Sequence, residues 1–550
     1  MSKALARMTD YNSTYQNFKW EVPEKFNWTR DVFDVWAEDP EKLAMIWVDD
    51  NDNEKRYTYA ELSRLSKRLA NVLQSRGVQR GDRVFVLLPR LVEWWVSKLA
   101  CLRMGAVFVP GTAQLTAKDL QYRFETAQGV AVLSDVVNAP KLEQIKENCP
   151  TLKTMIFVGG ERDGWLSYET EMATASDEFE TADTASDENA IMFFTSGTTG
   201  MPKITVHTHA SYPMGHRVTG AYWLDIQPDD LHWNMSDTGW AKASWSSFFG
   251  PWNQGAALFV HHSPRFDAKK TLELLSKYPI TTYCGAPTNY RVLVLEDLSQ
   301  YKFTTLRHCV AAGEPLNPEV IEVWRKATGV TIRDGYGQTE SCVLVANFPG
   351  QPVKEGSMGK PAPGFYVSII DNDGNEVEPG VEGDIAVRVK PERPVGLFKE
   401  YFGEPERTAG CFKGDWYITG DRGIKDEDGY LWFVGRADDV IISSGYRIGP
   451  FEVESALIEH EAVAESAVVA SPDELRGEIV KAFVVLAPGF SPSDELVKEL
   501  QDFVKNNTAP YKYPREIEFV ESLPKTVSGK IRRIELRELE RQRKQKTKSS

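Results

Sequence analysis

The chain has few cysteines and no long apolar run. Its six cysteines are scattered through 550 residues, without a CxxC pair or a cluster with histidine. That pattern excludes a disulfide scaffold, offers no zinc motif and suits a reducing compartment. No apolar run reaches the ~20 residues that a membrane-spanning helix needs. The N-terminal stretch lacks a secretory signal's apolar core and gains acidic residues early. We therefore expect a cytoplasmic protein with no membrane span.

Positive charge is also in deficit. The chain carries 64 lysines and arginines against 79 aspartates and glutamates, a formal net charge of -15. Duplex nucleic acid is therefore a poor partner, because its phosphates require a basic face. Basic residues gather only in residues 530–548. A solvated helix is the simpler interpretation of that stretch, and a site for an anionic cofactor is the alternative. We expect small-molecule partners, and the sequence leaves a homodimer open.

Two catalytic signatures are missing. The chain has no GxSxG or Ser-His-Asp signature, so nothing marks a protein nucleophile. The glycine-containing segment 195–203, TSGTTGMPK, is not a P-loop of the form GxxxxGK[ST], because Pro202 precedes Lys203 and Ile204 follows it.

The chain does have 42% hydrophobic residues over its full length, enough for two or more domains with their own cores.

Strand and helix patterns alternate through much of the chain. Between residues 59 and 129, helical periodicity alternates with short apolar runs, which predicts sheets with helices on their faces. An acidic segment, 174–189, is predicted to be a surface loop. The rhythm then resumes, with each strand running into a small-residue turn where ligand groups commonly lie. After residue 359 the pattern predicts β-hairpins, and from about residue 435 a small terminal unit.

Segment 195–203 has the chemistry of an anion-binding loop. It follows an apolar strand, its glycines allow turns that direct N–H groups at an anion, and Lys203 supplies positive charge. Such a turn can also exist without a ligand. The segment resembles, however, the phosphate-binding signature of the adenylate-forming superfamily of acyl-CoA synthetases, luciferases and peptide-synthetase adenylation domains. Further motifs follow in the family's order over nearly the whole chain.

The resemblance implies a fold and a division of the chain. It predicts an α/β protein with a large N-terminal domain of layered α/β sheets plus a β-barrel-like part, covering residues 1–435. A small mobile α+β C-terminal domain, residues 436–550, would follow. The residue matching the family's hinge is Asp438, about which the small domain would rotate between two half-reactions.

Two further motifs suit a nucleotide and a metal ion. In AAGEP (311–315) and DGYGQTE (334–340), Gly313 and Gly335 would let a flat base approach the backbone, and Tyr336 offers an aromatic face. Glu340 supplies a hard oxygen for Mg²⁺. By resemblance, Asp421 accepts hydrogen bonds from the ribose. The ATP-binding residues implied are Thr195, Ser196, Gly197, Thr198, Thr199, Gly200, Lys203, Gly313, Glu314, Pro315, Asp334, Gly335, Tyr336, Gly337, Gln338, Thr339, Asp421, Arg436 and Lys530.

A terminal lysine completes the implied catalytic set. PKTVSGK (524–530) matches the family's mobile-lysine motif, and Lys530 would bridge the substrate carboxylate and the α-phosphate, lowering the repulsion between two anions. Taken alone, such a lysine would be ordinary surface charge. The set implied by resemblance is Lys530, Thr198, Lys203 and Glu340, with Glu340 as the metal ligand.

The acceptor and the acid are also implied by resemblance. The coenzyme A residues would be Ser444, Gly445, Tyr446, Arg447, Arg476, Tyr513, Pro514 and Arg515, and the acyl pocket would comprise Trp240, Gly285, Ala286 and Gly337. Acetate-specific relatives carry tryptophan where this chain has Gly337, so the missing indole predicts room for a longer, branched or aromatic acid. Stretches such as SDTGW and SSGYRIGPFEVE are most similar to medium-chain acyl-CoA synthetases.

The expected function is ATP-dependent acyl-CoA synthesis through an acyl-adenylate, with acids of roughly four to eight carbons preferred. ATP, Mg²⁺ and coenzyme A are the expected cofactors and substrates. One alternative is an adenylating ligase with another acceptor, such as a carrier protein, although no carrier domain is evident. Another is a non-catalytic nucleotide-binding regulator, which would not need the mobile lysine.

Overall fold

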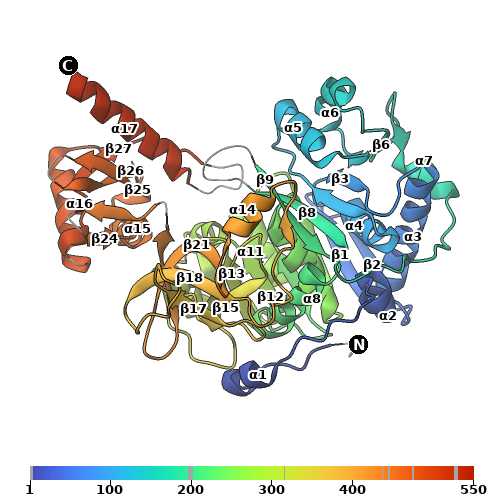
Figure 1. Ribbon diagram of the computed structural model, residues 1–550, viewed down its shortest axis with the longest axis horizontal. Coiled ribbons are helices and arrows are strands. Elements are labelled where there is room, and N and C mark those ends of the chain that lie inside the picture. Colours follow the sequence, from blue (N-terminus) through green and yellow to red (C-terminus); the bar gives the residue numbers. More distant parts are fainter. Residues whose placement is uncertain are drawn as a thin grey trace.

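The structure, a computed structural model, describes residues 4–195, 202–314, 316–437, 439–443, 446–473, 476–508, 510–525 and 531–549. Figure 1 shows a large N-terminal part and, beside it, a smaller C-terminal part coloured orange to red. Within the described residues, three sheets lie in the large part and a single sheet lies in the small part.

An eight-stranded sheet forms from the first alternating segment. α3 (Tyr59–Ser75) begins with a capping box, in which the Thr58 hydroxyl accepts from Glu61 N at 3.2 Å and the Glu61 carboxylate accepts from Thr58 N at 2.8 Å. α4 (Val92–Met104) ends at Gly105, whose φ of 74° suits glycine. β3, β4 and β5 are parallel, which confirms the predicted β-α-β pattern. The sheet order is β19 (Glu400–Tyr401), β9 (Lys203–Thr208), β8 (Asn189–Thr195), β4 (Val107–Pro110), β3 (Arg83–Leu87), β5 (Ala131–Ser134), β6 (Thr154–Phe157) and β7 (Leu166–Ser167).

A nine-stranded sheet carries the second half of the alternating pattern. Its central strands are parallel, so their carboxyl ends lie along one edge. Ala312, at the end of β13, pairs with Gly335 near the end of β14. The AAGEP and DGYGQTE motifs are therefore neighbours. The sheet order is β16 (Lys360–Pro361), β15 (Val343–Ala346), β14 (Ile332–Gly337), β13 (His308–Ala312), β12 (Thr282–Gly285), β10 (Leu231–Asn234), β11 (Ala257–His262), β1 (Leu43–Asp49) and β2 (Glu54–Thr58).

The hairpins predicted after residue 359 form a five-stranded antiparallel sheet. In this sheet Asp421 pairs with Arg436, the last residue of β22. Strand pairing therefore includes Arg436 in this sheet. The strands are β17 (Val367–Ile370), β18 (Glu382–Arg388), β20 (Phe412–Lys413), β21 (Trp416–Lys425) and β22 (Leu431–Arg436).

The small part has its own sheet and core. Its backbone meets the third sheet closely, because a Cβ on Gly449 would lie only 2.1 Å from the Val434 carbonyl oxygen. The strands are β23 (Ile441–Ser443), β24 (Tyr446–Ile448), β25 (Val463–Asp473), β26 (Gly477–Leu486) and β27 (Glu516–Phe519), and the helices are α15 (Pro450–Ile458), α16 (Asp494–Asn507) and α17 (Arg533–Ser549).

Helices cover the sheets of the large part. α4 is buried on nearly every side, as expected for a helix packed inside a layered protein. Among the described residues, no helix is both long enough and apolar enough to cross a membrane. The remaining helices are α1 (Tyr11–Asn17), α2 (Asp34–Trp36), α5 (Ala117–Ala127), α6 (Ala139–Ile145), α7 (Tyr168–Thr174), α8 (Ser211–Val218), α9 (Ala241–Ser244), α10 (Gly250–Asn253), α11 (Ala268–Lys277), α12 (Pro287–Leu293), α13 (Pro318–Thr328) and α14 (Pro405–Gly410), with π-helical turns at Thr29–Phe33, Thr219–Trp223 and Trp245–Phe249 and 3₁₀ turns at Lys146–Asn148, Leu298–Gln300 and Pro510–Lys512.

Candidate active site

Asp421, on β21, contacts the DGYGQTE motif. Its carboxylate accepts hydrogen bonds from the Tyr336 hydroxyl at 2.5 Å and from the Gln338 side-chain amide at 2.7 Å. Burial raises the pKa of Asp421, and the hydrogen bond from Tyr336 and the charge of Arg436 oppose that rise. The structure thus brings the turn after β14 and the middle of β21 into one polar site.

The nitrogen and the oxygen of the Gln338 side-chain amide both bond to residues of β21. Its nitrogen donates to the Thr419 carbonyl oxygen at 2.9 Å, and its oxygen accepts from the Tyr417 hydroxyl at 3.1 Å. These bonds orient the amide that reaches Asp421. The predicted residue Gln338 therefore positions the Asp421 carboxylate.

Lys203 and Glu340 form a second cluster. The Lys203 ammonium lies 3.0 Å from the Glu340 carboxylate. Tyr401 on β19 joins both, because its hydroxyl accepts from Lys203 at 2.5 Å and donates to Glu340 at 2.8 Å. The Lys203 ammonium also lies 4.0 Å from the Tyr401 ring centroid. Tyr401 was not predicted from the sequence, since it brings no motif of its own and reaches the site because β19 pairs with β9.

His207 fixes the backbone next to Glu340. Its Nε2 lies 2.7 Å from the Thr339 carbonyl oxygen, and its Nδ1 lies 3.2 Å from the Ser211 hydroxyl. Burial lowers its pKa to about 4, so the ring is neutral at pH 7. The Glu340 carbonyl oxygen in turn accepts from Phe398 N at 2.7 Å. The predicted residues Thr339 and Glu340 are therefore held by hydrogen bonds that the motifs alone did not reveal.

The lowered pKa of His207 predicts acid sensitivity. The unfolded chain binds a proton near the ordinary value of 6.5, whereas the folded chain resists protonation down to about 4. Stability is therefore fully present above about pH 6.5 and falls as the pH drops, by roughly 2 kcal/mol for this one group at pH 5. We expect the melting temperature to fall between pH 7.5 and pH 5, and His207→Asn to reduce that fall. An unchanged pH dependence in His207→Asn would contradict this assignment.

Charged side chains also contact the predicted adenine and acyl segments. Burial raises the pKa of Asp334 to about 8, although its carboxylate accepts a hydrogen bond from Gly335 N at 2.9 Å. Lys242 donates to the carbonyl oxygens of Gly285 at 2.7 Å and Ala312 at 3.1 Å. Glu314 accepts from Arg291 at 3.1 Å. Lys242, which was also not predicted from the sequence, thus links the predicted acyl and adenine segments.

Two glycines are required by packing. A Cβ on Gly335 would lie 2.4 Å from the Trp223 ring, so its bare side faces an indole. A Cβ on Gly337 would lie 2.4 Å from the Cys342 carbonyl oxygen, so the backbone leaves no room for a side chain at this position. Gly313 differs, because its φ is 114° and nothing lies within 4 Å of a Cβ placed there. Of the three glycines, Gly313 offers an open approach to the backbone.

Comparisons with known proteins show the family of this chain. The AMP-binding enzyme family matches residues 32–402, and the AMP-binding enzyme C-terminal domain matches residues 452–530. This chain belongs to the AMP-binding enzyme family. The predicted boundary at residues 435–436 lies between the two matches.

Curated relatives and the solved structures of similar proteins match nearly the whole length of this AMP-binding enzyme. Acyl-coenzyme A synthetase ACSM3 of Mus musculus is 52% identical over 97% of this chain and 93% of its own. ACSM4 of Homo sapiens is 52% identical, covering 94% and 91%. The anthranilate CoA ligase AuaEII with anthranoyl-AMP is 30% identical, with a TM-score of 0.86 and coverage of 94% and 98%. ATP-bound MatB from Rhodopseudomonas palustris is 29% identical, with a TM-score of 0.82 and coverage of 92% and 98%. The fold predicted from sequence is confirmed.

The AMP-binding enzyme carries its predicted coenzyme A residues on the small part. Tyr446 is 53% exposed and stacks on Tyr511, with ring centroids 4.4 Å apart. Arg515 donates to the Tyr513 hydroxyl at 2.9 Å, and its guanidinium lies 4.8 Å from the Tyr513 ring centroid. Arg476 lies in the turn between β25 and β26. The predicted residue Pro514 is buried beside Tyr513.

Several predicted residues of this enzyme lie outside the described residues. The two ends of the phosphate loop are described, because Thr195 and Lys203 pair across β8 and β9. The Thr195 hydroxyl is buried and finds no hydrogen-bond partner among the described residues. Trp240 and Ala286 are described and directly precede α9 and α12. The residues outside are Ser196, Gly197, Thr198, Thr199, Gly200, Pro315, Asp438, Ser444, Gly445 and Lys530, together with the side chain of Arg447.

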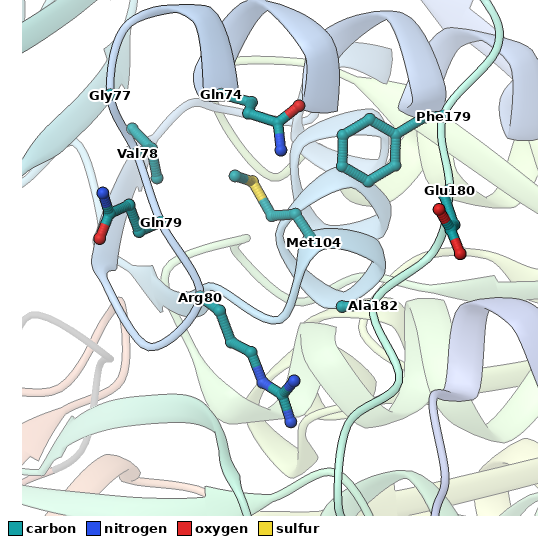
Figure 2. A pocket seen from close by; sticks show the side chains of 9 residues that line it. All are labelled: Gln74, Gly77, Val78, Gln79, Arg80, Met104, Phe179, Glu180 and Ala182. Carbon is teal, nitrogen blue, oxygen red and sulfur yellow. The ribbon is translucent and has the colours of Figure 1, made fainter.

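A separate cavity of about 410 Å³ lies elsewhere in the enzyme. Figure 2 shows its lining side chains, among them Met104, Phe179 and Arg80. Arg80 is ion-paired with Glu188. The lining contains none of the residues that the motifs predict. This cavity is therefore not the candidate active site.

Proposed function

We propose that this enzyme activates a medium-chain carboxylic acid with ATP as an acyl-adenylate and then transfers the acyl group to coenzyme A. The chain is an acyl-coenzyme A synthetase by its 52% identity to such enzymes over 97% of its length. The geometric observation that carries the proposal is the meeting of Tyr336 and Gln338, in the DGYGQTE motif, with Asp421 on β21, which lies 85 residues after Tyr336. Such a site suits a ribose, whose hydroxyls are good donors to a carboxylate.

The first half-reaction requires positioning and charge neutralisation. The acid's carboxylate oxygen attacks the α-phosphorus, the bond to the bridging oxygen breaks, and pyrophosphate leaves with the electron pair. Two anions must meet, so cationic side chains at the phosphates lower the barrier. We assign Lys203 to the outer phosphates and Lys530 to the carboxylate and the α-phosphate, with Thr198 as a further donor. No protein nucleophile is needed.

Glu340 fits the proposed Mg²⁺ site. The residue is 8% exposed, and its carboxylate accepts a hydrogen bond from the Tyr401 hydroxyl. The described residues contain no cluster of three or more acidic, histidine or cysteine ligands. Mg²⁺ suits such a site, because it takes one or two carboxylates and completes its shell with phosphates and water. When bound, Mg²⁺ supplies charge neutralisation of the triphosphate.

Tyr401→Phe tests the metal assignment. The variant keeps the ring under Lys203 but loses the hydroxyl that orients the Glu340 carboxylate. We expect the Mg²⁺ concentration for half-maximal pyrophosphate exchange to rise roughly tenfold, the scale of one hydrogen bond to a charged group. Tyr366→Phe is the matched control, because it also removes a hydroxyl bonded to a carboxylate, that of Glu376. Equal Mg²⁺ requirements in the two variants would contradict the assignment of Glu340 as the Mg²⁺ ligand.

The second half-reaction would use the small part. The thiol of coenzyme A attacks the acyl carbon, AMP leaves, and the thioester remains. We assign the coenzyme A nucleotide to Arg476, Arg515 and Tyr446, since guanidinium groups suit its phosphates. Rotation of the small part about Asp438 would move Lys530 away from the site and bring the coenzyme A residues to it. The division into domains 1–435 and 436–550 belongs to this proposal.

The preferred acid is proposed to have roughly four to eight carbons, or to be branched or aromatic. Support comes from the resemblance and from the solved structures, among which a benzoate CoA ligase from Burkholderia xenovorans LB400 is 29% identical with a TM-score of 0.81 and coverage of 93% and 100%. Pyrophosphate release across a panel of acids tests this. We expect acetate to be used weakly and hexanoate or benzoate well. Acetate as the best substrate would overturn the chain-length proposal.

Location and assembly remain predictions. The relatives ACSM3 and ACSM4 are named as mitochondrial, whereas the sequence of this chain led us to expect the cytoplasm. Imaging of the tagged chain in its native cell tests the location. The homodimer is tested by the mass of the chain in solution, and neither outcome alters the proposed chemistry.

A further inference from the structure

One face of α17 carries three charged residues that are largely shielded from solvent. Arg533, Arg537 and Glu540 are spaced four and three residues apart and so share a helix face. Glu540 is 1% exposed and accepts from Lys481 at 2.8 Å and from the Ser471 hydroxyl at 3.0 Å. These contacts fix α17 on β25 and β26, at the upper left of Figure 1. The interpretation of this stretch as a solvated helix is wrong for this face.

The first turn of α17 is bound to α15. Arg533 donates to the two carboxylate oxygens of Glu454 at 3.0 and 2.6 Å, and Glu454 also accepts from Val468 N at 2.7 Å. Burial would lower the pKa of Arg533, yet surrounding carboxylates hold it above its ordinary value. One of them is Glu314, in the predicted adenine loop. The start of α17 is therefore within electrostatic reach of the nucleotide motifs.

The next turn of α17 is bound to Asp439, the residue after the proposed hinge Asp438. Arg537 donates to the Asp439 carboxylate at 2.5 Å, and the two side chains are only 12% and 11% exposed. A shielded ion pair with good geometry is costly to break by removing one partner. Asp439 directly follows Asp438, the proposed hinge. One helical turn therefore separates a contact to the hinge segment from a contact to α15.

The same helix follows the lysine motif. Ile531, the first described residue after Lys530, forms an antiparallel bridge with Lys525. The backbone N–H of Arg532 donates to the Pro524 carbonyl oxygen at 2.8 Å. The two described ends of the lysine motif are thus paired, and the second end continues into α17 two residues before Arg533.

We propose that Arg537 and Asp439 are positioning residues for Lys530, fixing the start of α17, and with it the lysine motif, relative to the hinge. The inference rests on the proposed role of Lys530. Both residues lie on the small-part side of Asp438, so the pair turns with the small part as one body. Adenylation uses Lys530, so the pair supports that half-reaction. Thioester formation does not use Lys530, so the pair has no part in it.

Separating the two half-reactions tests this. Adenylation is measured as hexanoate-dependent exchange of pyrophosphate into ATP, and the second step as thioester formation from supplied hexanoyl-adenylate and coenzyme A. We expect Arg537→Gln and Asp439→Asn each to lower exchange by about tenfold or more and to leave thioester formation within about twofold, since small displacements of a catalytic group are costly. Arg541→Gln, at an exposed position of α17, should change neither.

Two further variants complete the test. Exchanging the charges, with Asp439→Arg and Arg537→Asp together, should restore part of the lost exchange. In a Lys530→Ala background, Arg537→Gln should lower exchange no further. Unchanged exchange in both single variants, equal loss in both half-reactions, or a further loss without Lys530 would overturn the inference. If Lys530→Ala itself leaves exchange intact, the proposed role of the lysine fails, and the positioning inference fails with it. Retained thioester formation shows that a variant is folded.

Discussion

Lys530→Ala is expected to lower acid-dependent pyrophosphate exchange by about a hundredfold to a thousandfold, the scale of removing one preorganised group that stabilises developing charge. Without the ammonium, the acid's carboxylate and the α-phosphate must approach with their repulsion unscreened. Thioester formation from supplied hexanoyl-adenylate should change by no more than about twofold, because that step needs no bridge between the two anions.

The neighbouring lysine is the control for Lys530→Ala. Lys525→Ala removes a charge from the same motif, but Lys525 is 40% exposed and pairs with Glu465 on the small part. It should leave both half-reactions near the level of the unaltered enzyme. Equal losses in the two lysine variants would remove the case for Lys530 as the catalytic residue.

Asp421→Ala is expected to raise the KM for ATP by about a hundredfold or more. The variant loses the acceptor proposed for the ribose, the partner of the Tyr336 hydroxyl and one of the two acceptors of the Gln338 amide, which keeps its bond to Thr419. A buried hydroxyl left unpaired costs roughly 1–3 kcal/mol, so some of the effect reaches the unliganded site as well. KM values from steady-state exchange at saturating hexanoate measure the change.

Comparison of nucleotides tells whether Asp421 serves the ribose. The unaltered enzyme should prefer ATP strongly over a 2′,3′-dideoxy analogue, and Asp421→Ala should lose most of that preference. Asp373→Ala, an exposed carboxylate in the turn after β17, is the control and should retain it. A variant that still discriminates as strongly as the unaltered enzyme would show that another group reads the ribose.

Local patterns predicted the elements, because their signals lie within a few residues. The alternation predicted between residues 59 and 129 is confirmed by α3 and α4, where the capping box at Thr58 begins α3 and Gly105 ends α4. The acidic segment 174–189 was predicted to be a surface loop, and that prediction missed the packing of Phe179 against the large core, because the neighbours of Phe179 are polar. Phe179 and the small Ala175, isolated in a polar run, give no period to detect.

The site was predicted where one motif holds its own chemistry, and missed where chemistry comes from distant strands. Asp421 and Glu340 stand in recognisable motifs. Tyr401 meets Lys203 across 198 residues, and only the pairing of β19 with β9 brings it there. The close approach of the Cys342 carbonyl to Gly337 was also missed, because that carbonyl belongs to the returning backbone; room for the acyl group there stays a prediction.

Formation of an acyl-adenylate by this enzyme is tested most directly by oxygen labelling. Hexanoate labelled with ¹⁸O in both carboxyl oxygens is incubated with ATP, Mg²⁺ and coenzyme A, and the products are examined by mass spectrometry. Attack on the α-phosphorus followed by thiolysis leaves one labelled oxygen in AMP and one in the hexanoyl thioester, with none in pyrophosphate. Label in inorganic phosphate, or AMP without label, would contradict the account.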